Sequence, residues 1–90
     1  MKEHRFNPGR TLITPAAVKA LKPEDVAAAM LRHLAGDWGD VCDEDRREND
    51  FSLEKGFRLL SVYHGVYGTK FWIITEADRS ATTVLLPEDY

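Results

Sequence analysis

The densest group of chemically active side chains lies between two apolar stretches near the C-terminal end. Within five positions the chain carries two carboxylates, a guanidinium and a hydroxyl, in the order Glu76, Asp78, Arg79 and Ser80. At the tip of a rigid hairpin such a set can recognise a polar partner. Asp78 and Ser80 can equally bond the backbone of the turn, with Arg79 pairing locally. We favour this structural interpretation and keep the turn as a candidate interaction site.

A second candidate is the segment 37–50, whose seven acids and two bases give it a charge of −5 in a chain of net charge −3. The candidate acidic face consists of Asp37, Asp40, Asp43, Glu44, Asp45 and Glu48. Acidic helices are ordinarily solvated surfaces. A row of carboxylates can also imitate a phosphate backbone and occupy the basic groove of a DNA-binding protein. Arg46 and Arg47 interrupt the row, so DNA mimicry stays an alternative.

Catalysis is the other class of chemistry that these residue types allow. A small hydrolase or nuclease would draw its site from His33, His64, Asp37, Asp78 and Arg79. Ser80 or Cys42 could act as the nucleophile, but a catalytic triad is recognised by geometry and not by composition. We therefore predict no catalytic residue and lean towards a protein that is not an enzyme.

Metal and cofactor chemistry finds little support. A site built from His33, Asp37, Asp40 and Cys42 would match no standard ligand spacing. The chain also lacks the glycine-rich and histidine motifs that cradle nucleotide phosphates or bind zinc. We predict no metal and no cofactor.

Three helices are expected to precede the apolar C-terminal stretches. They are Pro15–Leu21, a helix that starts at Pro23 and is ended by Gly36, and Asp43–Lys55, which is closed by Gly56. The first start is the clearest, because the hydroxyl of Thr14 can cap free N–H groups and proline is tolerated in the first turn.

Beyond residue 56 the apolar pattern changes to the period of two that is typical of strands. The predicted strands are Phe57–Tyr63, Lys70–Thr75 and Ala81–Leu86. Arg10–Ile13 is short and β-prone and is an optional N-terminal edge strand. We predict an α+β fold in which three short N-terminal helices are followed by a three-stranded antiparallel β-meander. It forms a single domain, 10–90, after a flexible N-terminus, 1–9.

Two tryptophans are expected to be structural. Trp38 lies between two glycines, which allow the backbone to turn its ring inward. Trp72 and Ile74 belong to one face of the predicted sheet, whereas Phe71 and Ile73 point to the other. Because three short helices can hardly cover two apolar faces, we hypothesise a homodimer through the sheet.

The overall composition limits the setting. Ninety residues make one small domain, and the single cysteine rules out an internal disulfide. The negative net charge argues against direct nucleic-acid binding, which usually needs a basic face. The N-terminus has no basic-then-apolar leader and no apolar run could span a bilayer, so we expect a cytoplasmic protein with no membrane contact.

Three segments together carry a family resemblance: GDWGD at 36–40, ENDFSLEKGFRLLSVY at 48–63 and FWIITEADRSATTVLLPEDY at 71–90. They resemble a family of small uncharacterised proteins found on bacterial plasmids and other mobile elements. Some members are labelled type I restriction enzyme modification subunit. A methyltransferase needs a glycine-rich strand end to hold its cofactor, which these 90 residues do not supply. The resemblance therefore implies a setting of mobile DNA and host-defence conflict.

Taken together, the sequence predicts a non-enzymatic protein-interaction or accessory module. Its partner would be an unknown host or plasmid protein, met through the turn 76–80 or the acidic segment 37–50. The alternatives are an anti-defence inhibitor with a DNA-mimic face, and the small hydrolase or nuclease described above.

Overall fold

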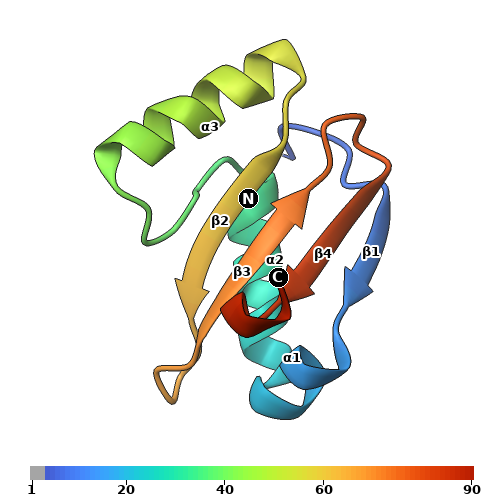
Figure 1. The fold of residues 1–90 in the computed structure, drawn as a ribbon, viewed down its shortest axis with the longest axis vertical. Helices are drawn as coiled ribbons and strands as arrows, with labels where there is room; N and C mark the ends of the chain where they lie inside the picture. The colour runs from blue at the N-terminus through green and yellow to red at the C-terminus, as the bar shows by residue number, and fades with distance from the viewer. Residues whose placement is uncertain (1–3) are drawn as a thin grey trace.

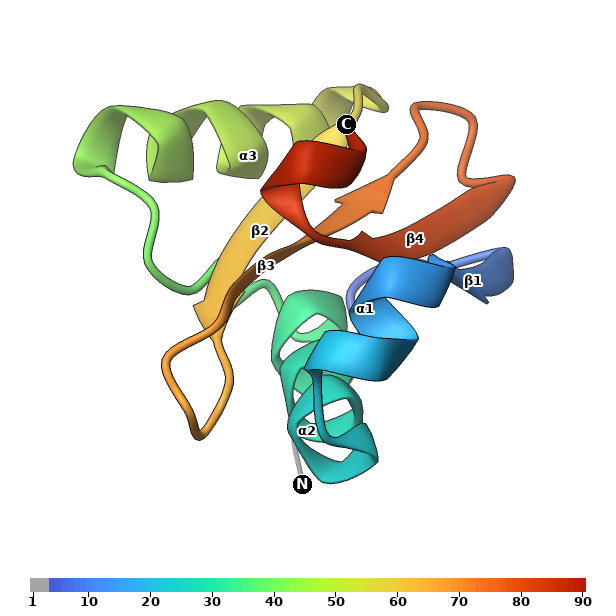
Figure 2. The same cartoon turned by 60° about the horizontal axis from the view of Figure 1, so that its bottom comes forward.

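The computed structural model describes residues 4–90 as a four-stranded sheet with helices on both faces (Figure 1, Figure 2). Its elements are β1 (Arg10–Ile13), α1 (Pro15–Ala20), α2 (Pro23–Leu34), α3 (Asp43–Lys55), β2 (Leu59–His64), β3 (Lys70–Thr75), β4 (Ala81–Leu85) and the short 3-10 helix η1 (Pro87–Asp89). None of the helices in the described residues is both long and apolar enough to cross a membrane.

The predicted fold class is wrong in its sheet. The strand order is β1-β4-β3-β2, and β1 pairs with β4 in parallel while β2, β3 and β4 pair antiparallel. The sheet is therefore mixed and four-stranded, and the chain enters it before the first helix. The optional strand Arg10–Ile13 is present, but its partner comes from the far end of the chain, with Arg10 beside Ala81. A four-residue pattern carries no information about so distant a partner.

The helix boundaries follow local signals. Thr14 caps α1 by accepting a hydrogen bond from the Ala17 amide at 3.2 Å, and its hydroxyl donates to Asp89 at 2.7 Å. Cys42 caps α3 through its sulfur, which accepts from the Asp45 amide at 3.5 Å. Gly56 ends α3 at φ 80°, a left-handed conformation that glycine adopts without strain.

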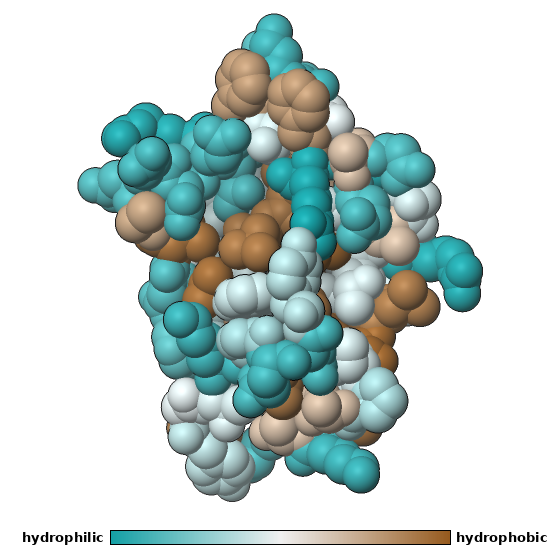
Figure 3. Space-filling view, in the orientation of Figure 1, coloured by the Kyte–Doolittle hydropathy of each residue, from teal (hydrophilic) through white to brown (hydrophobic). Residues whose placement is uncertain are grey.

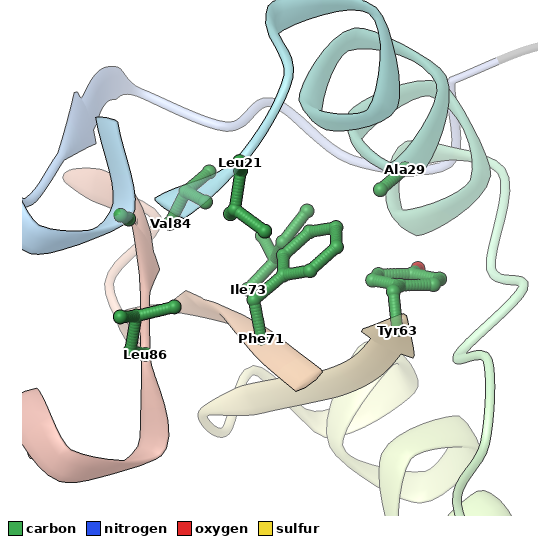
Figure 4. Packing of buried hydrophobic residues seen from close by; sticks show 8 residues of the cluster. Leu21, Ala29, Tyr63, Phe71, Ile73, Val84 and Leu86 are labelled. Atoms are coloured by element: carbon green, nitrogen blue, oxygen red, sulfur yellow. The ribbon is translucent and has the colours of Figure 1, made fainter. Parts of the chain in front are cut away.

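One face of the sheet packs on α1 and α2. The buried cluster there includes Leu21 of α1's C-terminal end, Tyr63, Phe71, Ile73 and Val84, and Figure 4 shows these side chains pointing into one space between sheet and helices. Fully burying one such side chain stabilises the folded state by about 1.5–3 kcal/mol. This cluster is the core that fixes the sheet against the helices.

The opposite face lies under α3 and η1 (Figure 2). There Ile74 is 2% exposed, and the ring of Trp72 makes an edge contact with Tyr90, with ring centroids 5.7 Å apart. Burial of Ile74 within one chain removes the packing argument for a homodimer through this face. Trp72 Nε1 is buried without a hydrogen-bond partner among the described residues.

The N-terminal residues 4–9 run from the end of α2 to the start of β1. The Arg5 amide donates to the Leu34 carbonyl at 2.7 Å, and the Phe6 ring makes an edge contact with His33 at 5.4 Å. Gly9 has φ 67°, and a Cβ there would overlap main-chain atoms of Ser80. Of the predicted flexible N-terminus 1–9, residues 1–3 lie outside the described part of the chain.

The outer edge of β2 is closed by other parts of the chain. Val62 exchanges main-chain hydrogen bonds with the loop before α3, donating to Trp38 at 3.0 Å and accepting from Asp40 at 2.7 Å. The Asn49 carboxamide, from α3, pairs with Leu60 in the same way: it donates to the carbonyl at 2.6 Å and accepts from the amide at 3.1 Å. This edge therefore has no room for another strand at these positions.

Replacing Asn49 with alanine is expected to lower the free energy of unfolding by about 2 kcal/mol, because both main-chain groups of Leu60 lose their partner. Urea unfolding measures the loss. Glu48→Gln, a change at the exposed neighbouring position, is the control and should leave stability unchanged. Equal stability of the two variants would show that other contacts hold α3 on the sheet.

Candidate functional site

The outer edge of β1 is the open edge of the sheet. Among the described residues β1 pairs only with β4, and all four of its residues are exposed. The amides of Arg10 and Thr14 donate to main-chain carbonyls on the β4 side, each at 3.0 Å. Because backbone groups alternate along a strand, the N–H and C=O groups of Thr11 and Ile13 point away from β4. Within residues 4–90 these groups have no main-chain partner, so they can pair with another strand.

An apolar groove of about 370 Å³ lies beside this edge, between β1, α1 and α2. We call it the β1 groove. Its lining is Thr11, Leu12, Ile13, Val18, Leu21, Pro23, Val26, Ala27, Met30 and Val84, none of them charged. At its mouth Ile13 is 41% exposed and Val18 57%. Apolar side chains that gather on a surface in this way mark interaction sites.

The groove is open because α1 is too short to fill it. Leu21 and Lys22 are extended, since Pro23 disfavours the helical conformation in the residue before it. The six residues of α1 span about 9 Å, which leaves part of the face below β1 uncovered. Elsewhere the same face of the sheet is covered by α1 and α2.

The charges around the β1 groove nearly cancel. The charged residues next to lining positions in the chain are Arg10, Lys19, Lys22, Glu24 and Asp25, three bases and two acids with a sum of +1. The acidic segment 37–50 lies instead at the β2 end of the strand order, on the side that Figure 3 shows as largely hydrophilic over α3. The open edge is thus the end of the sheet far from the acidic segment.

The predicted interaction turn 76–80 is closely tied to the rest of the fold. The Arg79 guanidinium donates to four main-chain oxygens, those of Ser52, Phe57, Glu76 and Ala77, at 2.7–3.2 Å. Arg79 itself has φ 61°, which is uncommon for a residue with a side chain. Its cation is therefore directed into the protein.

The other turn residues divide between structure and solvent. The Ser80 amide donates to the Asp78 carboxylate at 3.0 Å, and hydrogen bonds from Ser80 hold the pKa of Asp78 below its usual value. The Ser80 carbonyl also accepts from Arg10 at the start of β1. Glu76 and Asp78 are exposed, so the turn offers two carboxylates at its surface.

Several acids of the segment 37–50 have partners within the chain. Four accept interactions within the chain: Asp37 from Arg32 at 2.8 Å, Asp40 from His64 at 2.7 Å, Asp43 from Arg46 at 2.8 Å and Asp50 from Trp38 Nε1 at 2.9 Å. Trp38 itself is 2% exposed. Asp45 and Glu48 border a hollow of about 300 Å³ with Arg58, whereas Glu44 is exposed on α3.

His33 is fully buried in a chain of hydroxyl groups. Its Nδ1 lies 2.5 Å from Ser61 Oγ and its Nε2 2.9 Å from Thr75 Oγ1. Thr75 is 2.8 Å from the hydroxyl of Thr82, which donates to the Pro8 carbonyl at 2.7 Å. Each hydroxyl has one proton, so Thr75 donates to Thr82 and accepts from His33. The histidine therefore carries its proton on Nε2, and Ser61 donates to Nδ1.

This environment keeps His33 neutral. Burial, with a smaller contribution from the nearby Arg79 cation, lowers the pKa of His33 to about 3. The partners of its ring nitrogens are hydroxyls and not carboxylates, and its side chain is 0% exposed. His33 is not placed with Asp37 or Asp78 in the way that the hydrolase alternative requires.

His64 is the histidine that meets an acid, since its Nδ1 lies 2.7 Å from Asp40 Oδ2. Both side chains are exposed, at 44% and 66%. Cys42 is exposed too and uses its sulfur as a helix cap. Within residues 4–90 no three acidic, histidine or cysteine side chains gather closely enough to hold a metal ion.

The β1 groove was not among the sites expected from the sequence. Its residues look like core residues in a linear reading, because Val26 and Met30 continue the apolar stripe of α2. One signal in the sequence could have indicated the groove. Leu12, Ile13 and Val18 are more apolar residues than a four-residue strand and a six-residue helix can bury.

A comparison of the chain with protein-family models, curated proteins and solved structures gave no match in any of the three.

Proposed function

We propose that the chain is a non-enzymatic protein-interaction module that binds an extended segment of a protein by strand addition at β1. The observation that carries the proposal is the open edge of β1 beside the β1 groove. In this binding mode main-chain hydrogen bonds supply affinity, and pockets for alternate side chains supply specificity.

The contrast between the two sheet edges supports this proposal. Proteins usually protect edge strands with prolines, charges, bulges or covering segments, because an open edge pairs with other chains. The β2 edge is covered by the loop before α3 and by Asn49. β1 reads RTLI, with one charge at its start and no proline. Apart from Arg10 and its length of four residues, β1 has none of these protections.

The setting that we propose is bacterial mobile DNA, on the strength of the sequence resemblance. An accessory protein of such an element works by assembling with other proteins, which an interaction module can do without a catalytic site. Strand addition at β1 would use neither the turn 76–80 nor the acidic segment 37–50.

The test is selection of binders from a displayed library of random peptides on the immobilised chain. We expect enrichment of peptides with apolar residues at alternate positions. Thr11→Pro should abolish their binding, because it removes an outward N–H and places a ring on the edge. The inward bonds of Arg10 and Thr14 do not involve this N–H, so the fold should survive.

Thr11→Val is the matched control and should bind normally, since it keeps the N–H. A second control neutralises the acids of α3 (Asp43→Asn, Glu44→Gln, Asp45→Asn and Glu48→Gln together) and should also bind normally. Loss of binding in this variant, with Thr11→Pro unaffected, would transfer the function to the acidic face.

A further inference from the structure

We infer that the strand that pairs with β1 is β1 of a second copy, across a two-fold axis at Leu12. This inference rests on the proposed function, because it names the occupant of the same edge. This pairing joins two four-stranded sheets into one continuous sheet. The packing of the helices on the two faces of each sheet does not change.

The backbone of β1 is complementary to itself in one antiparallel register. Thr11 and Ile13 present the outward donors and acceptors. When Leu12 lies on the two-fold axis, Thr11 stands opposite Ile13 of the second copy, and Ile13 opposite its Thr11. These are hydrogen-bonded pairs, and they use every outward group of the strand.

Neighbouring registers do not achieve this match. An axis at Ile13 would place Thr11 opposite Pro15 of the second copy, which has no N–H to donate. An axis at Thr11 would place Ile13 opposite Gly9, whose φ of 67° is outside the strand region. The register at Leu12 is therefore favoured by the chain's own sequence.

The side chains suit the same arrangement. Ile13 stands beside Val84 in the sheet, whose side chain belongs to the core cluster on the α1 and α2 face. Its counterpart in a second copy would lie on that same face, over the β1 groove. Leu12, 41% exposed, would meet its own counterpart in the close, non-hydrogen-bonded pairing at the axis.

Pairing through β1 limits the charge repulsion between two copies. Each chain carries −3, and the segment 37–50 alone carries −5. Pairing through β1 puts the two acidic segments at opposite ends of the joined sheet. Arg10 would stand opposite Thr14 of the second copy, so the two guanidinium groups are also kept apart.

Sedimentation velocity from low to high micromolar concentration tests the dimer. The wild type and Thr11→Val should dimerise, and Thr11→Pro should weaken the dimer at least about tenfold, because each copy loses an intermolecular hydrogen bond. A dimer that persists unchanged in Thr11→Pro would place the interface elsewhere and overturn the inference.

A cross-linking experiment tests the register and does not need a proline. In a Cys42→Ser background, Leu12→Cys places two thiols opposite each other at the axis, within reach of a disulfide. Oxidised glutathione should convert this variant to a covalent dimer, and the Ile13→Cys control should not respond. Equal cross-linking of both variants would overturn the register.

The two proposals fail in different ways. A wild type that stays monomeric, with peptide binding that Thr11→Pro abolishes, would overturn the second copy as occupant and leave strand addition intact. A monomeric wild type that binds no peptide would overturn both.

Discussion

Lowering the pH from 6.5 to 3 is expected to destabilise the folded protein by about 4 kcal/mol through His33 alone. In the unfolded chain the imidazole titrates near its ordinary pKa of 6.5, whereas burial lowers the pKa of the folded protein's His33 to about 3. Between these values the unfolded state binds one more proton than the folded state. The contribution of neutral His33 to the free energy of unfolding is therefore fully present above pH 6.5. It is lost progressively as the pH falls towards 3.

Urea unfolding at a series of pH values measures this loss. Thr11→Val is the control: it changes an exposed residue and removes no titratable group, so its stability should depend on pH as that of the wild type does. NMR titration of the ring carbons gives an independent reading, in which His33 should stay neutral, with its proton on Nε2, down to about pH 4. An ordinary titration near pH 6.5 would contradict the buried hydroxyl chain.

Replacing Arg79 with alanine is expected to lower the free energy of unfolding by about 3 kcal/mol, because four main-chain carbonyls lose a charged donor. Arg79→Gly should cost about 1 kcal/mol less than alanine, since glycine adopts φ 61° without a clash. Arg79→Lys should lie between arginine and alanine, because an ammonium cannot span the same set of oxygens.

Thermal and urea unfolding of these three variants gives the order of stability. Arg47→Ala, at an exposed position on α3, is the control and should change stability little. Alanine and glycine at position 79 with equal stability would show that the backbone conformation stores no strain. If Arg79→Ala were as stable as Arg47→Ala, the hydrogen bonds of Arg79 with the four carbonyls would contribute nothing to the free energy of unfolding.

The parts of the fold that were predictable from sequence depend on short-range physics. The bounds Asp43–Lys55 and Lys70–Thr75 are confirmed, and Thr14 caps α1 as expected. Hydroxyl caps, prolines and terminal glycines act within one turn, so the sequence displays them directly. The parallel pairing of β1 with β4 joins residues near opposite ends of the chain, and no local pattern encodes it.

The candidate sites show the same division. Asp78 and Ser80 could be recognised as turn residues, because their bonds lie within the turn. The contacts of Arg79 with Ser52 and Phe57 could not, since they depend on how α3 is placed over the hairpin. The β1 groove was missed for a related reason. The exposure of Val18 depends on whether another segment packs against it in the folded protein, and the sequence does not show this.

The polar residues that hold α3 on the sheet affect how the attachment of this helix responds to temperature. Its buried positions are Asn49 and Ser52, and Phe51 on the same helix is 50% exposed. Detaching α3 would hydrate the carboxamide of Asn49 and the hydroxyl of Ser52 as well as the apolar face of the sheet at Ile74. The polar groups contribute little or negatively to the heat capacity, so cooling does not weaken this part of the attachment in the way it weakens the hydrophobic part. Loosening of α3 would uncover the second edge of the sheet, at Leu60, without disturbing the apolar core.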